Sequence, residues 1–204
     1  MLTPRPYNAM QRHGAFFDAD NDHKVTVKET AEGLQDLGLS AKKAGRLAPI
    51  VNIGLALPQK NFKTIELDRL QANIDPKTPG AFDAVGNFDA AKFEAMFAFD
   101  GGKTGSLTQA EVGRLIDASA LSAIGKFRTK AGYGLLFEVA ADTQKPVLDA
   151  SGKPVLGKDG KPQVAPALTR ERLKSFFLGT IFHDIAAAKG NPRPVHDGLT
   201  RKAP

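Results

Sequence analysis

The stretch "FFDADNDHKVTVKET", residues 16–30, decides the expected fold because it places oxygen-bearing side chains at regular spacing between two helical patterns. With Asp18 as position 1, acidic residues also stand at positions 3, 5 and 12. Calcium takes about six to eight oxygen ligands, and a loop with this alternation supplies them. The predicted ligands are Asp18, Asp20, Asp22, the carbonyl of Lys24, Thr26 and Glu29.

This spacing is that of an EF-hand calcium loop, in which the apolar residue at position 8, here Val25, pairs with a partner loop. Position 6 of such a loop is normally glycine because the turn requires a positive φ angle, but this chain has His23 there. Histidine adopts positive φ at some energetic cost, so the sequence predicts a weakened calcium site. The alternative is an acidic loop that only caps the following helix.

Helical patterns flank the acidic loop on both sides. Residues recur at helical spacing over 7–17 and predict a helix that enters the loop. Thr26 and Glu29 form a capping-box pattern that opens a second helix, and Gly38 ends it. Residues 7–37 are therefore predicted to form a helix–loop–helix unit.

A second acidic loop runs from Asp100 at position 1 to Glu111 at position 12. Thr104 and Ser106 supply oxygens at positions 5 and 7, whereas Gly102 at position 3 brings no side-chain ligand. The sequence therefore predicts a weaker second calcium site, formed by Asp100, Thr104, Ser106 and Glu111. A purely structural loop is the alternative.

Because EF-hands normally pair, each acidic loop needs a partner. Residues 81–92 and the pair Leu168–Thr169 follow the same pattern without calcium ligands. We therefore expect a mainly α fold of EF-hand helix–loop–helix units in two paired lobes, with short β bridges and a hairpin-like insertion.

The chain as a whole is predicted to be one domain over residues 1–190. Lys-Pro pairs between glycine turns indicate short hairpins after residue 144, and a final helix is predicted over 170–188. The predicted parts are the first EF-hand at 7–37, an insertion at 38–64, a second EF-hand region at 81–120, C-terminal helices with an insertion at 125–188, and a flexible tail at 191–204.

The composition of the 204 residues narrows the function classes. The absence of cysteine excludes disulfides, thiolate metal sites and cysteine nucleophiles. The net charge of +6 comes from scattered Lys and Arg, so no nucleic-acid partner is expected. No signal peptide is visible, and the longest apolar run, residues 48–58, is too short to span a bilayer. We expect a soluble or peripherally lipid-associated protein, with the compartment left open.

Five segments together resemble the caleosin family, in the family's order and at similar distances. They are "AMQRHGAFFDADNDHKVTVKETAEGLQDLG" (9–38), "GNFDAAKFEAMFA" (86–98), "SLTQAEVGRLI" (106–116), "AGYGLLFEVAAD" (131–142) and "ERLKSFFLGTIF" (171–182). The resemblance implies a calcium-binding EF-hand protein, often bound to lipid droplets. Caleosins that carry haem are peroxygenases, oxidoreductases that move an oxygen atom from a fatty-acid hydroperoxide to an alkene, sulfide or amine.

The family's haem is ascribed to two histidines, and the first matches His13 in "QRH". The resemblance thus implies that His13 is the haem axial ligand and carries catalysis. A neutral imidazole among apolar residues suits iron ligation. The second family position aligns with Asp75, which leaves one axial ligand and an open iron face. The alternative for His13 is a histidine that caps or packs, and His183 is expected in the core or at its boundary.

Residues 48–58 are shorter than the apolar segment of caleosins. Their apolar side chains, preceded by three cations, predict an interfacial helix on a lipid surface, and a core element under the EF-hands is the alternative. The expected function is a calcium- and haem-dependent peroxygenase acting on fatty-acid hydroperoxides and unsaturated lipids or other acceptors. The alternative function is a non-catalytic calcium-binding lipid-surface or scaffold protein that has lost haem.

Overall fold

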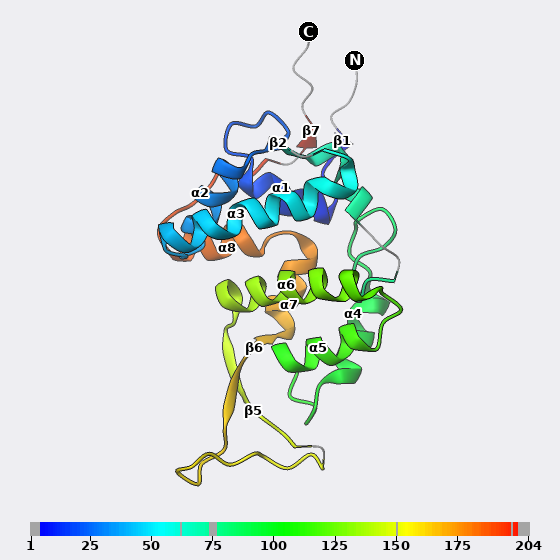
Figure 1. Cartoon of the computed structure of the whole chain (residues 1–204), viewed down its shortest axis with the longest axis vertical. Helices are drawn as coiled ribbons and strands as arrows, with labels where there is room; N and C mark the ends of the chain where they lie inside the picture. The colour runs from blue at the N-terminus through cyan, green and yellow to red at the C-terminus, as the bar shows by residue number, and fades with distance from the viewer. Residues whose placement is uncertain (1–4, 62, 74–76, 150, 197, 200–204) are drawn as a thin grey trace. The chain divides into compact units, whose positions relative to one another are not determined.

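The computed structural model describes residues 5–61, 63–73, 77–149, 151–196 and 198–199. These residues form two compact units, each of which contains one acidic loop (Figure 1). Unit 1 comprises the described residues up to 73, residues 82–88 and those from 175 onward, and unit 2 comprises residues 77–81 and 89–174.

Within the described ranges the fold is mainly α, as the sequence predicted. The α-helices are α1 Ala9–Phe17, α2 Val27–Asp36, α3 Ala41–Ala56, α4 Ala90–Met96, α5 Gln109–Asp117, α6 Ala123–Ala140, α7 Arg170–Leu178 and α8 Ile181–Ala188. Short 3-10 helices are η1 Leu57–Gln59, η2 Leu67–Asn73 and η3 Phe97–Phe99. The strands are β1 Arg5–Pro6, β2 Lys24–Val25, β3 Ile65–Glu66, β4 Ser106–Thr108, β5 Thr143–Pro146, β6 Val164–Thr169 and β7 Gly198–Leu199.

Capping residues fix where the helices around the first loop begin and end. Asn8 caps α1 by accepting a hydrogen bond from the backbone N–H of Gln11 at 2.8 Å. The predicted capping box of Thr26 and Glu29 opens α2, which confirms this reading of the sequence. Gly38 follows the last turn of α2 with a φ of 97°, a conformation that glycine adopts at least cost.

The first loop pairs with a segment that the sequence analysis did not consider as its partner. Val25 in β2 pairs antiparallel with Ile65 in β3. Residues 81–92 do not supply this partner, because Phe88 forms a bridge with Phe82 in the same segment. The turn between them is closed by the Asp83 carboxylate, which accepts hydrogen bonds from the next backbone N–H groups. The expectation that this segment pairs with an acidic loop was therefore wrong.

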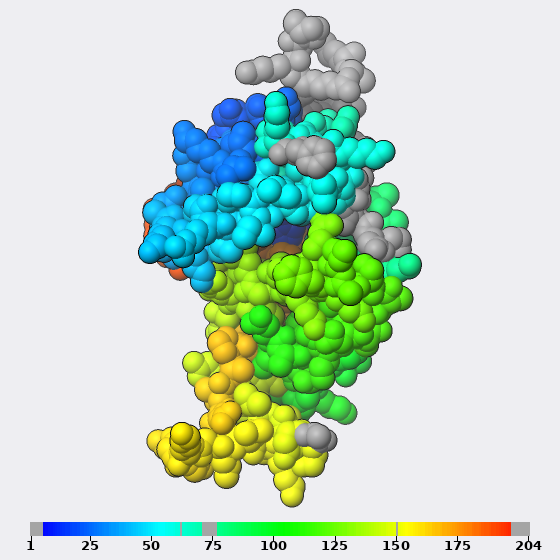
Figure 2. All heavy atoms as spheres, viewed as in Figure 1, coloured from blue at the N-terminus to red at the C-terminus, as the bar shows by residue number. Residues whose placement is uncertain are grey.

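The segment assigned to an insertion, residues 38–64, contains the long helix α3. Its inner face consists of small residues and the buried amide of Asn52, which donates to the Val25 carbonyl at 3.0 Å. Its outer face carries Ile50, 65% exposed, and Ile53, 53% exposed. The light-blue to cyan surface of α3 is visible on unit 1 in Figure 2. One face of α3 therefore packs in unit 1 and the other presents apolar side chains to solvent, while contact of this helix with a lipid surface stays a prediction.

None of the helices in the described ranges combines the length and the apolar character that crossing a membrane requires.

The predicted single helix over residues 170–188 is wrong, because the chain forms two helices, α7 and α8, that are separated at Gly179. Gly179 has a φ of 82°, which helix geometry does not allow. A Cβ atom at this position would lie 2.5 Å from the carbonyl oxygen of Ala9 and 2.7 Å from Cβ of Arg12. The break therefore lets the chain pass close to the start of α1, which only glycine permits.

Unit 2 combines helices α4, α5 and α6 with a sheet in the order β4-β6-β5. Leu107 pairs with Leu168, so the pair Leu168–Thr169, which the sequence indicated as a ligand-free partner without saying of which loop, lies beside the second acidic loop. The β5–β6 hairpin extends away from the helices of this unit (Figure 1). Two further bridges, Leu148 with Pro154 and Leu156 with Pro162, follow along it. The hairpin-like insertion is therefore confirmed.

Described residues of the segment assigned to a flexible tail make specific contacts within unit 1. The guanidinium of Arg193 donates to the carboxylate of Asp36 and to the carbonyl oxygen of Phe16, the latter at 3.2 Å. Strand β7 pairs antiparallel with β1. These contacts connect the end of the described chain to α1, α2 and β1.

Candidate functional site

The first acidic loop brings three carboxylates together between α1 and α2. One oxygen from each of Asp18, Asp20 and Asp22 lies within 4.8 Å of the others. Asp18 is 1% exposed, and the other two face solvent. Among the described residues, this is the group of acidic side chains whose spacing suits one metal ion.

Backbone N–H groups of the loop orient these carboxylates. Those of Asp22 and His23 donate to the two oxygens of Asp18 at 3.1 and 3.0 Å, and that of Lys24 donates to Asp22 at 2.8 Å. A carboxylate oxygen has more than one lone pair, so each retains acceptor capacity for a cation. These hydrogen bonds therefore hold the carboxylates of the loop in a grouped arrangement.

The remaining predicted ligands lie at the end of this loop. Lys24 is in β2, and Thr26 is the N-cap of α2. The Glu29 carboxylate accepts from the backbone N–H of Ala19 at 3.1 Å and from that of Thr26 at 2.8 Å. Glu29 thus joins the two ends of the loop, and the helix-capping role of the sequence alternative is present in the geometry.

The charge balance of the first loop favours a cation. Burial raises the pKa of Asp18, and the nearby Asp22 and Glu29 carboxylates raise it further, while backbone hydrogen bonds from His23 and Asp22 oppose the rise without cancelling it. An ion with two positive charges would relieve this repulsion. The donor set consists of hard oxygen atoms, the type that calcium prefers.

His23, the residue that departs from the usual glycine, has the expected positive φ of 68°. Its Nδ1 lies 2.8 Å from the hydroxyl of Tyr7, which is 2% exposed. Burial, followed by the charge of Asp18, raises the pKa of Tyr7 to about 12, so the hydroxyl keeps its proton and can donate to Nδ1. No sequence pattern indicates this pair, because no periodicity connects Tyr7 to the loop.

The second acidic loop repeats three backbone hydrogen bonds of the first, from the N–H groups at positions 2, 6 and 9. Asp100 accepts from the backbone N–H of Gly105 at 2.7 Å, and Glu111 accepts from those of Gly101 and Thr108, each at 2.8 Å. The hydroxyl of Thr104 donates to Asp100 at 3.2 Å. The two loops therefore share one backbone design.

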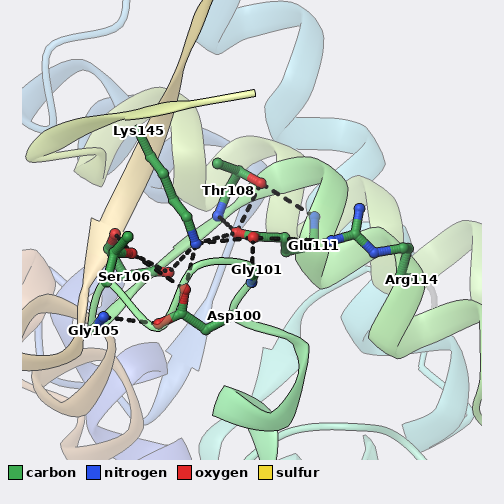
Figure 3. Close-up of polar contacts among 9 residues, drawn as sticks. Asp100, Gly101, Gly105, Ser106, Thr108, Glu111, Arg114 and Lys145 are labelled. Carbon is green, nitrogen blue, oxygen red and sulfur yellow. Dashed lines mark hydrogen bonds and ion pairs between the residues drawn. The ribbon is translucent and has the colours of Figure 1, made fainter. Parts of the chain in front are cut away.

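The second loop differs because a lysine side chain enters it (Figure 3). Nζ of Lys145, from β5, contacts the carboxylate of Asp100, the carbonyl oxygen of Ser106 at 3.1 Å and both oxygens of Glu111 at 2.8 and 3.0 Å. Burial acts to raise the pKa of Asp100, but the Lys145 ammonium and backbone donors outweigh it, and the pKa is lowered. Sequence reasoning missed Lys145, since its approach depends on the register of the hairpin.

His13 lies on α1, among phenylalanine side chains of unit 1. The imidazole centroid is 4.6 Å from the ring centroid of Phe176, 5.1 Å from that of Phe182 and 6.2 Å from that of Phe82. Both of its ring nitrogens are buried and, among the described residues, neither makes a hydrogen bond of normal geometry, although the backbone of Phe176 lies close enough to favour the protonated ring in part. A buried imidazole without partners is costly, which is a reason to consider a ligand role.

The donor chemistry of His13 fits a haem iron. Burial lowers the pKa of His13 to about 4, and the backbone of Phe176 opposes this only in part, so the imidazole is neutral and can donate a lone pair. Neither ring nitrogen is accessible, because Phe176 and Phe182 pack against the ring, although the residue as a whole is only partly buried. Haem could therefore be accepted only if the rings of Phe176 and Phe182 move aside.

A second haem histidine is not established by the fold. Asp75, which aligns with the second family position, lies outside the described residues. His183 on α8 has a buried Nδ1 without a hydrogen-bond partner, and its ring packs against Phe16 with centroids 5.1 Å apart. Burial also lowers the pKa of His183, and the backbone of Arg193 opposes this only in part, so His183 is a second imidazole in contact with this aromatic cluster through Phe16.

Comparison with protein families gives one matching family. The family described as "Caleosin related protein" matches residues 5–149, which include the first loop, the second loop and His13. No solved structure matches this chain.

Two curated relatives carry peroxygenase names. Probable peroxygenase 4 of Arabidopsis thaliana is 32% identical over 102 residues, which cover 47% of this chain and 52% of the relative. The peroxygenase of Lilium longiflorum is 24% identical over 147 residues, which cover 66% of this chain and 60% of the relative. The chain thus spans between half and two thirds of the length of these relatives.

Proposed function

Since the chain belongs to the caleosin family, we propose that it is a calcium-binding peroxygenase that transfers an oxygen atom from fatty-acid hydroperoxides to unsaturated lipids or other acceptors. The observation that carries this proposal is the buried, unpartnered imidazole of His13 on the helix that leads into the acidic loop. The peroxygenase names of two relatives support it.

In this proposal the first loop is an EF-hand that binds calcium. Its side-chain ligands would be the three clustered aspartates, Thr26 and Glu29, with the Lys24 carbonyl between them. Calcium would neutralise the carboxylates of the loop and fix the end of α1. His13 lies five residues before Asp18, so an ordered loop would also fix the direction of the imidazole.

His13 would be the axial ligand of a haem in the aromatic cluster. Bound haem would supply the oxygen-transfer chemistry, which no side chain of this protein provides. The protein would hold the imidazole neutral, keep water away through Phe82, Phe176 and Phe182, and present an apolar surface to an acyl chain.

A peripheral lipid contact would bring such substrates to the protein. The outer face of α3 presents Ile50 and Ile53, and Leu57 in η1 is 47% exposed. The exposed cations Lys42 and Arg46 lie on the same helix. Apolar side chains beside cations are typical of helices that lie at a lipid interface.

The test is the haem content and the oxygen-transfer rate of protein purified with an ample haem supply. We expect a Soret absorbance and hydroperoxide-dependent oxidation of a sulfide, both lost in His13→Ala while calcium binding is retained. His183→Ala, compared in parallel, should keep both signals. If His183→Ala loses haem and His13→Ala keeps it, the ligand assignment is wrong.

The second candidate function is a non-catalytic calcium-binding protein of lipid surfaces or a scaffold. The observation in its favour is the closed packing of Phe176 and Phe182 around His13. If no Soret absorbance appears and His13→Ala unfolds the haem-free protein, His13 is a packing residue and this second function gains support.

A further inference from the structure

The buried cation at the second loop is part of the protein itself. Side-chain exposure is 2% for Lys145, 4% for Asp100 and 6% for Glu111. A buried ammonium is tolerated only when acceptors surround it, and Lys145 has four oxygen contacts. The three groups form a closed ion cluster rather than a surface ion pair.

The acceptors of Lys145 occupy defined positions of the loop. Counted from Asp100, they are the carboxylate at position 1, the carbonyl oxygen of Ser106 at position 7 and both oxygens of Glu111 at position 12. In an EF-hand these three positions bind the calcium ion. The ammonium therefore stands where the metal would stand (Figure 3).

The sheet of unit 2 fixes this lysine in place. Strand β4 begins within the loop, β6 pairs with β4, and β5 pairs with β6. Lys145 is opposite Ala165 in the β5–β6 register. The loop and its lysine thus belong to one hydrogen-bonded sheet, so the effective concentration of the ammonium at the loop is high.

The remaining positions of the loop suit a cation with one charge. Gly102 stands at position 3, and position 5 holds Thr104, a neutral residue. The loop therefore offers two carboxylates, those of Asp100 and Glu111, and both contact the ammonium of Lys145. The first loop, in contrast, has four carboxylates. The second loop therefore offers calcium fewer charged ligands than the first.

We propose that Lys145 is a tethered cation that replaces calcium in the loop from Asp100 to Glu111. The loop is held in its closed form at every calcium concentration, and unit 2 does not respond to the ion. Calcium could enter only by displacing a buried ammonium from its acceptors. This replaces the weaker calcium site that the sequence predicted there, and it goes beyond the peroxygenase proposal because it does not depend on haem.

The decisive variant is Lys145→Met, which keeps an unbranched side chain, shorter by only the terminal nitrogen, and removes its charge. It is combined with Glu29→Gln, which removes a ligand from the first loop but keeps a capping-box residue type. Lys153→Met is the matched control, because Lys153 lies on the same hairpin and is exposed. Calcium alone is the probe. Titration calorimetry measures its binding, and thermal unfolding in chelator and in millimolar calcium measures its effect on the melting temperature.

If Lys145 replaces calcium in the second loop, the following results are expected. Glu29→Gln alone shows at most a residual calcium binding, weaker by about a hundredfold or more, which Glu111→Gln does not change. Adding Lys145→Met lowers the melting temperature in chelator by about 10 °C, because two buried carboxylates lose their cation. Calcium then restores at least half of this loss and binds at one new site, which Glu111→Gln abolishes. Lys153→Met changes none of these values.

Two results would overturn the proposal. One is calcium binding in Glu29→Gln that disappears with Glu111→Gln, since calcium would then displace Lys145 in the native chain. The other is a Lys145→Met protein that is as stable in chelator as Lys153→Met. If Lys145→Met does not fold in chelator, the proposal still requires that it folds on addition of calcium; failure in both conditions contradicts it.

Discussion

The hydroxyl of Tyr7 lies 2.8 Å from Nδ1 of His23, so a side chain from the segment before α1 holds the residue at position 6 of the first loop. His23 has a φ of 68°, which costs a non-glycine residue of the order of 1 kcal/mol. A hydrogen bond with a buried donor contributes about the same amount. The pair explains how this loop accommodates a histidine where glycine is usual.

Removing the Tyr7 hydroxyl should weaken calcium binding. Tyr7→Phe leaves the aromatic ring in the core but releases His23, so we expect the calcium Kd to rise by up to about tenfold. Titration calorimetry measures this directly. Tyr133→Phe, a change at a buried tyrosine of unit 2, is the control and should leave the Kd unchanged. Equal affinities for Tyr7→Phe and the native chain would show that the pair does not support the loop.

Glu29, at position 12 of the first loop, should be required for tight calcium binding. Glu29→Gln removes the charge that joins the two ends of the loop, and we expect calcium affinity to fall by about a hundredfold or more. Glutamine also serves in a capping box, so the helix should remain intact. Glu32→Gln, on the same helix and paired with the exposed Lys28, is the control. Calorimetric binding that persists in Glu29→Gln contradicts the assignment of this loop.

The burial of His13 predicts a pH dependence of stability in the haem-free protein. Its pKa is about 4 in the fold and about 6.5 in the unfolded chain, so only the unfolded state binds a proton between these values. The stability is fully present above pH 6.5 and is lost as the pH falls to 4, by up to about 3 kcal/mol.

Denaturant unfolding at several pH values tests this dependence. His13→Leu should have a smaller loss of unfolding free energy over the same range, with a remaining part from His183, whose pKa is also lowered. Identical pH profiles for His13→Leu and the native chain would mean that His13 is accessible to protons in the fold.

The outer face of α3 should determine lipid binding. Ile50→Ser combined with Ile53→Ser removes two exposed apolar side chains, and we expect binding to anionic phospholipid vesicles to fall by about tenfold or more. Sedimentation with vesicles measures the bound fraction. Val85→Ser, at another exposed apolar residue of unit 1, should bind as the native chain does. Unchanged sedimentation of the double variant would exclude α3 as the lipid contact.

The local parts of this structure could be predicted from the sequence. The capping residues Thr26 and Glu29 and the spacing of acidic residues predicted helices, loops and the close grouping of carboxylates in the first loop, because each depends on neighbours a few positions away. The hairpin was also predictable from its turn residues, and the repeated Leu-Thr pair indicated Leu168–Thr169 as a partner segment without saying which loop it joins.

Contacts between distant segments could not be predicted in this way. The helix break at Gly179 depends on the approach of the chain to Ala9, which helical periodicity does not record. The entry of Lys145 into the second loop depends on the register of β5 and β6. Charge spacing within the loop therefore suggested a weak metal site where the fold brings in an ammonium group.

Oxygen transfer from a fatty-acid hydroperoxide can be tested by determining where the oxygen atom of the product comes from. The haem-loaded protein is given a fatty-acid hydroperoxide labelled with heavy oxygen and an unlabelled sulfide, and the sulfoxide is analysed by mass spectrometry. The account predicts labelled sulfoxide from the native chain and none from His13→Ala. A haem-loaded native chain that forms no labelled sulfoxide would contradict it.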